Sequence, residues 1–327
     1  MKKFSKKYEE IITSGNLLLA WEDFLSGKRQ RTDVAVFQTK LSDNLFRLDR
    51  ELKSKTYQHG PYQAFNISDP KPRSIHKAAV RDRLLHHLLY QETYRYFDRQ
   101  FIHDSYSCRL DKGAHRAVRR FAEFADKVSR NGHRTVWVLN GDIRKFFASI
   151  DHQILKDILN EYIAGPELLW LFGQVIDSFE TLGRPGIGLP LGNLTSQLLV
   201  NVYMDEFDQF VKCSLKVKYY IRYADDFVLL SPDRSYLLDL QSKLEEFLVR
   251  RLKLSLHPKK VYLKTLASGV DFLGWVQFGD HRVLRPTTKR RMLKRIETDP
   301  PLATRAAYSA LLEHGNAYKL RQRVGLR

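Results

Sequence analysis

Apolar residues recur with a helical spacing through the first third of the chain. The face of a predicted helix that follows Asp33 carries Phe37, Leu41, Leu45, Leu48 and Leu52. A longer helix is predicted from about Ala78 to Phe101, with Val80, Leu84, Leu88 and Leu89 on its core side. Residues 1–32 are polar and basic, so we expect a short helix and a loop there. The proline-marked segment ISDPKPRS (67–74) is expected to be extended.

The central part of the chain alternates between the strand period and the helix period. Strands are predicted at 134–143, 218–231 and 253–263, the second of these as a hairpin, and helices at 152–163, 194–211 and 236–252. The helix at 194–211 follows a glycine-proline loop (183–193) and has a stripe formed by Leu194, Leu198, Val202 and Val211. When the helix at 152–163 is left out, the order is β-α-β-β-α-β. This order predicts a split βαβ sheet.

The C-terminal part begins with a second predicted hairpin and then becomes strongly basic. The hairpin spans 269–285 and is expected to turn near Gly279–Asp280. Two helices follow, separated by Pro300–Pro301, and Gly315 is a predicted helix stop.

Composition adds a class of partner to this picture. The 327 residues include 55 Lys and Arg against 37 Asp and Glu, a formal charge of +18, with 43% hydrophobic residues. This charge favours a polyanion, with nucleic acid as the first candidate and an anionic membrane surface as the second. No apolar run reaches the ~20 residues of a spanning helix, and the run Leu17–Trp21 is too short for a signal peptide. Cys108 and Cys213 fit neither a metal spacing nor a disulfide framework. We therefore expect a soluble, cytoplasmic protein.

Two adjacent aspartates interrupt the predicted hairpin KYYIRYADDFVLLS (218–231). A solvated hairpin turn is the ordinary explanation for Asp225 and Asp226, but both flanks are apolar and no glycine relaxes the turn. Asp142 ends the strand at 134–143, which the split βαβ plan places beside this hairpin. Three carboxylates at one sheet edge repel each other unless divalent cations lie between them. Mg²⁺ binds such carboxylates together with substrate phosphates, and two such ions support phosphoryl transfer in polymerases.

The motifs, taken in order, resemble those of reverse transcriptases. YADD (223–226) is similar to the catalytic box of that family, and DIRKFFASIDH (142–152) to the preceding metal-binding box. The other similar segments are DPKPRSIHKAAVRDRLL (69–85), SYSCRLDKGAHRAV (105–118), GIGLPLGNLTSQLLVNVYMDEFD (186–208), LHPKKV (256–261) and DFLGW (271–275). The likeness covers roughly 60–285. It implies an α+β right-hand polymerase with an N-terminal basic helical extension (1–55), fingers and palm (56–283) and a short α-helical thumb (284–327).

The resemblance assigns a role to individual positions. It implies two Mg²⁺ ions, with Mn²⁺ as a substitute, held by Asp142, Asp225, Asp226 and the Ile143 carbonyl. Lys260 matches the lysine proposed to protonate the pyrophosphate leaving group, and Lys259 fits that position nearly as well. Asp151 is expected to be a helix N-cap. The histidines show no zinc spacing.

The nucleotide contacts implied by the resemblance are Lys71, Arg73, Phe147, Leu191, Gly192 and Gln197. Lys71 and Arg73 would meet the triphosphate, although solvated charges in an extended loop explain them too. Phe147 matches the ring that excludes a ribose 2′-hydroxyl; its alternative is a core aromatic, which is our interpretation of Phe146. The thumb residues implied to follow the template–primer backbone are Arg285, Lys289, Arg290, Arg291, Lys294 and Arg295, for which a solvated charged face is the competing interpretation.

The central box departs from the common family pattern. Leu191 replaces the usual glutamine and Gln197 the usual proline, giving PLGNLTSQ (190–197). This form resembles reverse transcriptases of diversity-generating retroelements, which copy a template-repeat RNA into cDNA with errors opposite adenine. The mutated cDNA then replaces a variable region of a target gene. Leucine cannot hydrogen-bond the nucleotide, so the pocket could tolerate mispairs; neutral variation in a loop is the alternative. SALLEHGNAYKL (309–320) also resembles the thumb of this group.

Two other functions compete with this hypothesis. One is a retron or another group II intron-like bacterial reverse transcriptase. Retrons share the small size, and only the LGNLTSQ box argues against them, whereas an intron protein would usually add a maturase domain and often a nuclease domain, which we do not expect here. A non-catalytic RNA-binding protein on a polymerase scaffold is the alternative outside enzymes, against which the presence of all three aspartates speaks. Template RNA, primer or cDNA and dNTPs are the implied partners, with a small basic accessory protein, the accessory variability determinant. The basic segment 1–32 is a candidate docking surface for the accessory protein and the RNA. No membrane partner is expected.

Overall fold

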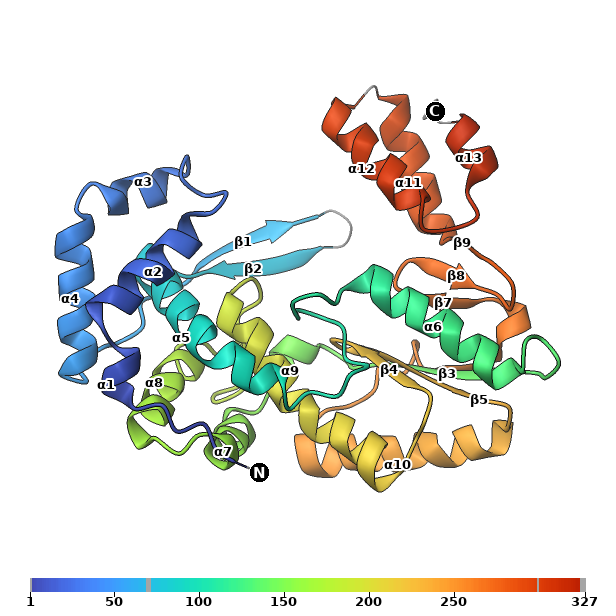
Figure 1. The fold of residues 1–327 in the computed structure, drawn as a ribbon, viewed down its shortest axis with the longest axis horizontal. Helices are drawn as coiled ribbons and strands as arrows, with labels where there is room; N and C mark the ends of the chain where they lie inside the picture. Colours follow the sequence, from blue (N-terminus) through green and yellow to red (C-terminus); the bar gives the residue numbers. More distant parts are fainter. Residues whose placement is uncertain (1, 69–71, 299, 324–327) are drawn as a thin grey trace. The chain divides into compact units, whose positions relative to one another are not determined.

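The computed structural model describes residues 2–68, 72–298 and 300–323, which form two compact units (Figure 1). Unit 1 combines 1–103, 144–210 and 247–255, and unit 2 combines 104–143, 211–246 and 256–327. The predicted domain boundaries at 55/56 and 283/284 lie inside unit 1 and unit 2, respectively, and stay predictions.

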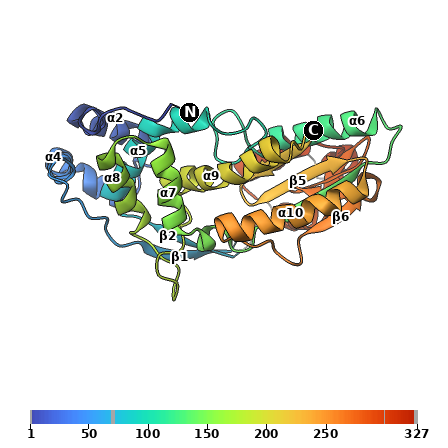
Figure 2. The same ribbon diagram turned by 90° about the horizontal axis from the view of Figure 1, so that it is seen from below.

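Unit 1 is a group of helices from which a two-stranded hairpin extends (Figure 2). Its elements are α1 (Tyr8–Ile11), α2 (Ser14–Leu25), α3 (Thr32–Gln38), α4 (Leu41–Lys53), β1 (Gln63–Ile67), β2 (Arg73–Lys77), α5 (Val80–Asp98), α7 (His152–Tyr162), α8 (Pro166–Ile176) and α9 (Leu194–Gln209). Helix α5 packs against α2 and α9, so its predicted core side is buried. The predictions for α5, α7 and α9 are confirmed, with ends that differ by a few residues.

Two predictions in unit 1 need correction, whereas the predicted extended segment at 67–74 is confirmed at its strand residues Ile67, Arg73 and Ser74. The helix predicted after Asp33 is two helices, because the chain turns at Thr39–Lys40 between α3 and α4. The extended segment at 67–74 contributes to an antiparallel hairpin, with Ile67 paired to Arg73. Residues 1–32 contain α1 and α2, and the buried side chains of Leu17, Trp21 and Phe24 belong to the core.

Unit 2 contains the predicted split βαβ sheet. Its strands are β3 (Trp137–Asp142), β4 (Tyr220–Tyr223), β5 (Asp226–Ser231) and β6 (Tyr262–Thr265), in the order β4-β5-β3-β6. Helix α6 (Ala114–Ser129) packs on β4 and β5, and α10 (Arg234–Leu252) connects β5 to β6 and runs from unit 2 into unit 1. A π-helical turn (Phe210–Ser214) joins α9 to the segment before β4. The sheet is confirmed, but the strand predicted at 253–263 begins only at Tyr262.

Alternation along the strands decides which side chains share a face. Val138 and Val228 are buried against α6 residues such as Phe121, and Asp142 and Asp226 follow them at even spacing on the same face. On the other face, a Cβ atom at Gly141 would lie 2.2 Å from the Phe227 ring. The glycine therefore permits the ring to cross β3 immediately before Asp142.

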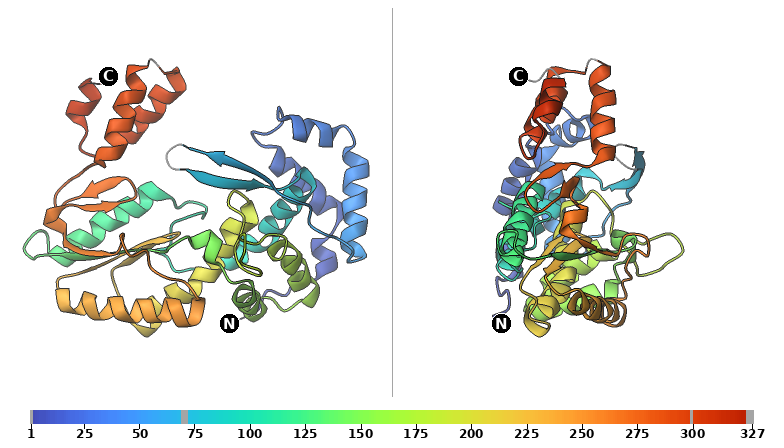
Figure 3. Two further views of the ribbon diagram at one scale, coloured as in Figure 1. Left: turned by 180° about the vertical axis from the view of Figure 1, so that it is seen from behind. Right: turned by 90° about the vertical axis from the view of Figure 1, so that its right-hand side faces the viewer.

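A three-stranded meander and three short helices complete unit 2 (Figure 3). They are β7 (Val270–Phe272), β8 (Trp275–Gln277), β9 (Arg282–Leu284), α11 (Pro286–Glu297), α12 (Leu302–Leu312) and α13 (Tyr318–Arg323). The predicted turn near Gly279–Asp280 is confirmed, but Leu273–Gly274, both at positive φ, make an additional turn that the prediction missed. Helix α12 ends at Leu312, upstream of the predicted stop at Gly315.

Gly315 has a packing role instead. A Cβ atom there would lie 2.1 Å from the Trp275 ring. Trp275 belongs to a cluster with Met292 and Leu312, which fastens α11 and α12 to the meander. None of the described helices is long and apolar enough to cross a membrane.

Candidate active site

The three predicted carboxylates come together in unit 2. Asp142 is the last residue of β3 and lies directly opposite Asp226, the first residue of β5. Asp225 occupies the turn before β5, and its carbonyl accepts a 3.1 Å hydrogen bond from the Ile143 N–H. Antiparallel pairing of β3 with β5 therefore sets two carboxylates face to face, with the third adjacent in the chain.

The turn that carries Asp225 is strained, and a buried arginine supports it. Ala224 has a φ of 55°, in the left-handed region that disfavours a residue with a Cβ atom. The Arg222 guanidinium donates to the Ala224 carbonyl at 3.1 Å and to the Ser105 hydroxyl at 3.1 Å. Arg222 has no exposed surface. A buried cation thus compensates for the absence of a glycine in the turn.

Burial and crowding change the acidity of this site. Burial, followed by the negative charge of Asp225 and by Asp142, raises the pKa of the Asp226 carboxyl to about 8. Lys260 acts in the opposite direction. Its ammonium contacts both carboxylate oxygens of Asp142, at 2.8 and 2.7 Å. The raised pKa therefore reflects burial first and the neighbouring carboxylates second.

The donor set fits a divalent cation that is completed by its substrate. No group of three or more His, Cys, Asp or Glu side chains within the described ranges forms a metal cage by itself. Mg²⁺ is usually held by one or two carboxylates together with substrate phosphates. A pair of facing carboxylates, Asp142 and Asp226, with Asp225 next in the chain, suits that mode of binding.

The structure distinguishes the two candidate lysines by their contacts. Within the described residues, the ion pair to Asp142 is made by Lys260, whereas the Lys259 backbone N–H bonds the His257 ring. A tight turn creates this arrangement, because His257 N–H donates to the Asp142 carbonyl at 2.7 Å and Lys260 N–H to the His257 carbonyl at 2.9 Å. This turn replaces the first part of the strand predicted at 253–263.

Most of the predicted nucleotide contacts lie together in unit 1. Phe147 is half-buried in a 3₁₀ turn (Phe146–Ser149), and its carbonyl accepts a 2.8 Å bond from the Leu189 N–H. The Leu191 carbonyl accepts a 3.1 Å bond from the His76 N–H on β2. Arg73, exposed, begins the same strand. Lys71 lies outside the described residues.

Other predicted residues of unit 1 have these positions. Gln197 is half-buried in the first turn of α9, and Phe146 is a buried core aromatic, as predicted. Asp151 is confirmed as the N-cap of α7, where it accepts a 3.1 Å bond from the Ile154 N–H. Burial alone would raise the pKa of Asp151, but the Lys253 ammonium and this N–H lower it.

The predicted template–primer residues lie on and before α11 in unit 2. Lys289, Arg290, Arg291, Lys294 and Arg295 are exposed, on a helix whose buried side is formed by Met292. Arg285 differs because it is partly buried and pairs with Asp271 at 2.5 Å. Its first role is therefore to fix the start of α11 on the meander.

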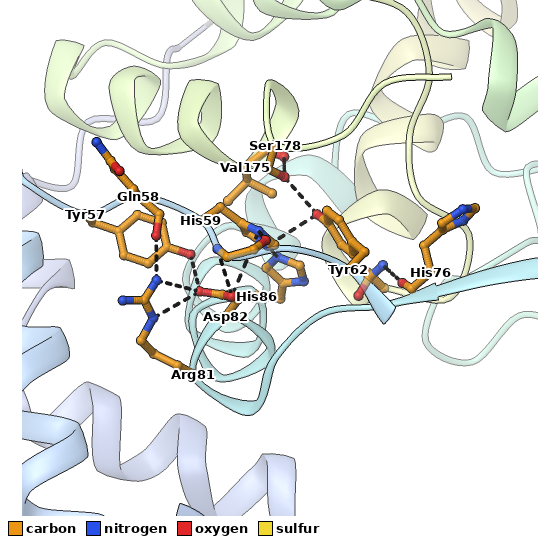
Figure 4. Close-up of polar contacts among 12 residues, drawn as sticks. Tyr57, Gln58, His59, Tyr62, His76, Arg81, Asp82, His86, Val175 and Ser178 are labelled. Atoms are coloured by element: carbon orange, nitrogen blue, oxygen red, sulfur yellow. Dashed lines mark hydrogen bonds and ion pairs between the residues drawn. The ribbon is translucent and has the colours of Figure 1, made fainter. Parts of the chain in front are cut away.

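A buried polar network at the base of the hairpin was not predicted (Figure 4). Asp82, fully buried, accepts from the Tyr57 hydroxyl at 2.8 Å and the Gly60 N–H at 3.1 Å. The His59 and His86 Nε2 atoms lie 3.1 Å apart. His59 Nδ1 faces the Gly60 carbonyl at 2.6 Å and must donate to it, so we assign the proton between the two rings to His86. Burial is the main cause that lowers the pKa of both imidazoles, so they stay neutral.

Comparison with known proteins assigns the family. The family described as reverse transcriptase (RNA-dependent DNA polymerase) matches residues 68–276. Protein YkfC of Escherichia coli K12 is 24% identical over 323 residues, which cover 85% of this chain and 81% of that protein. The group II intron-encoded protein LtrA of Lactococcus lactis is 22% identical over 230 residues, 66% of this chain and 36% of LtrA. A 91 kDa protein in the cob intron of Schizosaccharomyces pombe is 24% identical over 238 residues.

The relatives differ in how much of their own length the chain covers. The chain spans 81% of YkfC, but 36% of LtrA and 28% of the S. pombe protein. The family match itself covers most of the chain and contains the sheet with Asp142, Asp225 and Asp226. The expectation of a polymerase with fingers and palm is therefore confirmed at the level of the family. The chain belongs to the reverse transcriptase (RNA-dependent DNA polymerase) family.

Proposed function

We propose that this chain polymerises DNA on an RNA template by a two-cation mechanism centred on Asp142, Asp225 and Asp226. The observation that carries the proposal is the pairing of Asp142 with Asp226 across β3 and β5, next to Asp225 in the chain. Two divalent cations bound there would stabilise the attacking and leaving oxygens of phosphoryl transfer. The Ile143 carbonyl is the proposed additional ligand.

The other proposed roles concern binding and proton transfer. Lys260 is the proposed acid for the pyrophosphate leaving group, supported by its position on Asp142. Lys71 and Arg73 are proposed to bind the triphosphate, and Phe147 to exclude a 2′-hydroxyl. The exposed basic residues of α11 are proposed to follow the backbone of the template–primer duplex.

We further propose that the enzyme serves a diversity-generating retroelement, in which it copies template-repeat RNA with errors at adenine. The support is Leu191, which offers the nucleotide no hydrogen bond, together with Gln197 in the same box. The similarity to LtrA favours a second candidate, a group II intron-like reverse transcriptase of another kind. The error spectrum separates the two, because only the first function requires errors concentrated at adenine.

The proposed accessory protein would dock on the N-terminal helices. Leu18 and Leu19 on α2 are 44% and 59% exposed, whereas Leu17 is buried. The chain and the expected partner are both basic, so an apolar contact is a better basis for docking than charge. Removing residues 1–32 would strip Trp21 and Phe24 from the core, and point substitutions are therefore the cleaner test.

An Asp225→Asn variant should lose RNA-templated primer extension by at least about 100-fold, because the amide cannot provide the anionic ligand. Extension of a labelled DNA primer with Mg²⁺ measures this loss. Asp23→Asn, at an exposed carboxylate on α2, is the matched control and should extend at the wild-type rate. Equal extension by wild type and Asp225→Asn would refute the enzyme proposal.

A Lys260→Met variant should lower kcat by about 100-fold, the size expected when a general acid is removed. Lys259→Met makes the same chemical change one residue away and should alter kcat by less than about threefold, since no general acid is lost. Single-turnover rates measured from pH 6 to pH 9 check this difference. A larger loss in Lys259→Met would transfer the role of acid to that residue.

A Leu191→Gln variant should make about tenfold fewer errors at template adenines, because glutamine restores a hydrogen bond that discriminates between nucleotides. Leu191→Met keeps an apolar side chain and should retain the wild-type spectrum. Sequencing of cDNA made on a defined RNA measures both. Wild-type errors spread evenly over the four template bases would remove the diversity-generating assignment and leave the polymerase standing.

A Leu18→Ser, Leu19→Ser double variant should reduce capture of the accessory protein by about tenfold, the loss of roughly one apolar contact pair. Both leucines are exposed, so the melting temperature should stay unchanged. Leu182→Ser removes an equally apolar and 99% exposed side chain elsewhere in unit 1 and serves as the control. Wild-type capture by the double variant would place docking elsewhere.

A further inference from the structure

The outer edge of β2 is covered by the loop that precedes α9. His76 lies opposite Ala64 in the hairpin, but its N–H donates outward to the Leu191 carbonyl at 3.1 Å. Its carbonyl accepts from the Asn193 side-chain amide at 2.8 Å. Both backbone groups of one strand residue are thus bound by residues two positions apart in the PLGN loop (190–193). Figure 4 shows His76 apart from the network around Asp82.

Each position of the loop contributes a different property to this contact. Leu191 supplies a backbone carbonyl. Gly192 has a φ of 106°, and a Cβ atom there would lie 2.8 Å from the Ile75 side chain, so the close approach to β2 requires glycine. Asn193 supplies a side-chain bond, from a residue that is 3% exposed.

The Asn193 side chain acts as a hydrogen-bond donor through its Nδ2 atom. Its Oδ1 atom is buried and has no hydrogen-bond partner among the described residues, whereas Nδ2 bonds His76. Asn193 is also the N-cap residue of α9, but within the described residues its side chain makes no capping hydrogen bond to that helix. The amide is therefore oriented toward β2 and not toward its own helix.

We infer that Asn193 is a positioning residue for the incoming nucleotide: it latches β2 to the PLGN loop and so fixes Arg73, three residues earlier on the same strand. The inference rests on the proposed role of Arg73 at the triphosphate. At ~3.3 Å per residue, Arg73 lies about 10 Å along β2 from the latch. A strand freed at His76 displaces the guanidinium from the phosphate, which weakens binding without changing the reacting groups.

An Asn193→Leu variant tests the inference, because leucine has a similar shape and cannot donate. We expect the KM for dNTP to rise about five- to tenfold and kcat to stay within about twofold, the loss of one buried hydrogen bond that positions a ligand. Hydrogen exchange in residues 72–78 should accelerate, while exchange in α5 should not, which shows that the fold is intact. Asn44→Leu removes an equivalent bond, from Asn44 Nδ2 to the Phe37 carbonyl at 2.9 Å, and should leave KM unchanged.

A double-mutant cycle decides whether the latch acts through Arg73. If it does, Arg73→Ala and Asn193→Leu together raise KM by clearly less than the product of their separate effects. Multiplicative effects, an unchanged KM in Asn193→Leu or unchanged exchange in 72–78 would overturn the inference. An unchanged KM in Arg73→Ala would overturn it too. A wild-type chain that extends no primer would refute the polymerase proposal instead, and exchange in 72–78 would still report on the latch.

Discussion

The pairing of Asp142 with Asp226 is the constraint that organises unit 2. Two carboxylates on opposed strands repel each other, and burial together with the neighbouring carboxylates raises the pKa of Asp226 to about 8. The fold holds the acids in place partly through the backbone, with Ile143 N–H on the Asp225 carbonyl and His257 N–H on the Asp142 carbonyl. The ion pair of Asp142 with Lys260 adds to this backbone support.

The remaining parts of the sheet follow from that requirement. Phe227 crosses β3 over Gly141, so the strand pair is fixed beside the acids by apolar packing on the opposite face. Arg222 supports the Ala224 carbonyl from a fully buried position. Burying a cation is costly unless its donors are satisfied. The hydrogen bonds to the Ala224 carbonyl and the Ser105 hydroxyl satisfy donors of Arg222. The bond to Ala224 in turn helps a turn without glycine to keep a left-handed residue next to Asp225.

The sequence predicted the strands, most helices and the order of the sheet, but not which side chains from different segments contact each other. The alternation in 134–143 and 218–231 predicted the sheet, and its connectivity predicted that Asp142 would lie beside the hairpin. The break between α3 and α4 was missed because the apolar stripe continues across Thr39–Lys40. The glycine in NGD (140–142) and the arginine in YIRYADD (220–226) were visible signals of close approach and of a buried partner, but only the structure shows Phe227 and Ser105 as those partners.

The PLGN loop separates the residue proposed to meet the nucleotide from the atoms that hold β2. Residue 191 holds β2 through its backbone carbonyl, which every amino acid possesses. This hydrogen bond therefore does not depend on the side chain at 191. The side chains at 192 and 193 are restricted. Residue 192 must lack a Cβ atom, and residue 193 must carry a hydrogen-bond donor. If residue 191 meets the nucleotide as proposed, a change between glutamine and leucine there alters that contact while the backbone bond to His76 remains. The proposed effect on fidelity and the proposed placement of Arg73 would then depend on different atoms of the same loop.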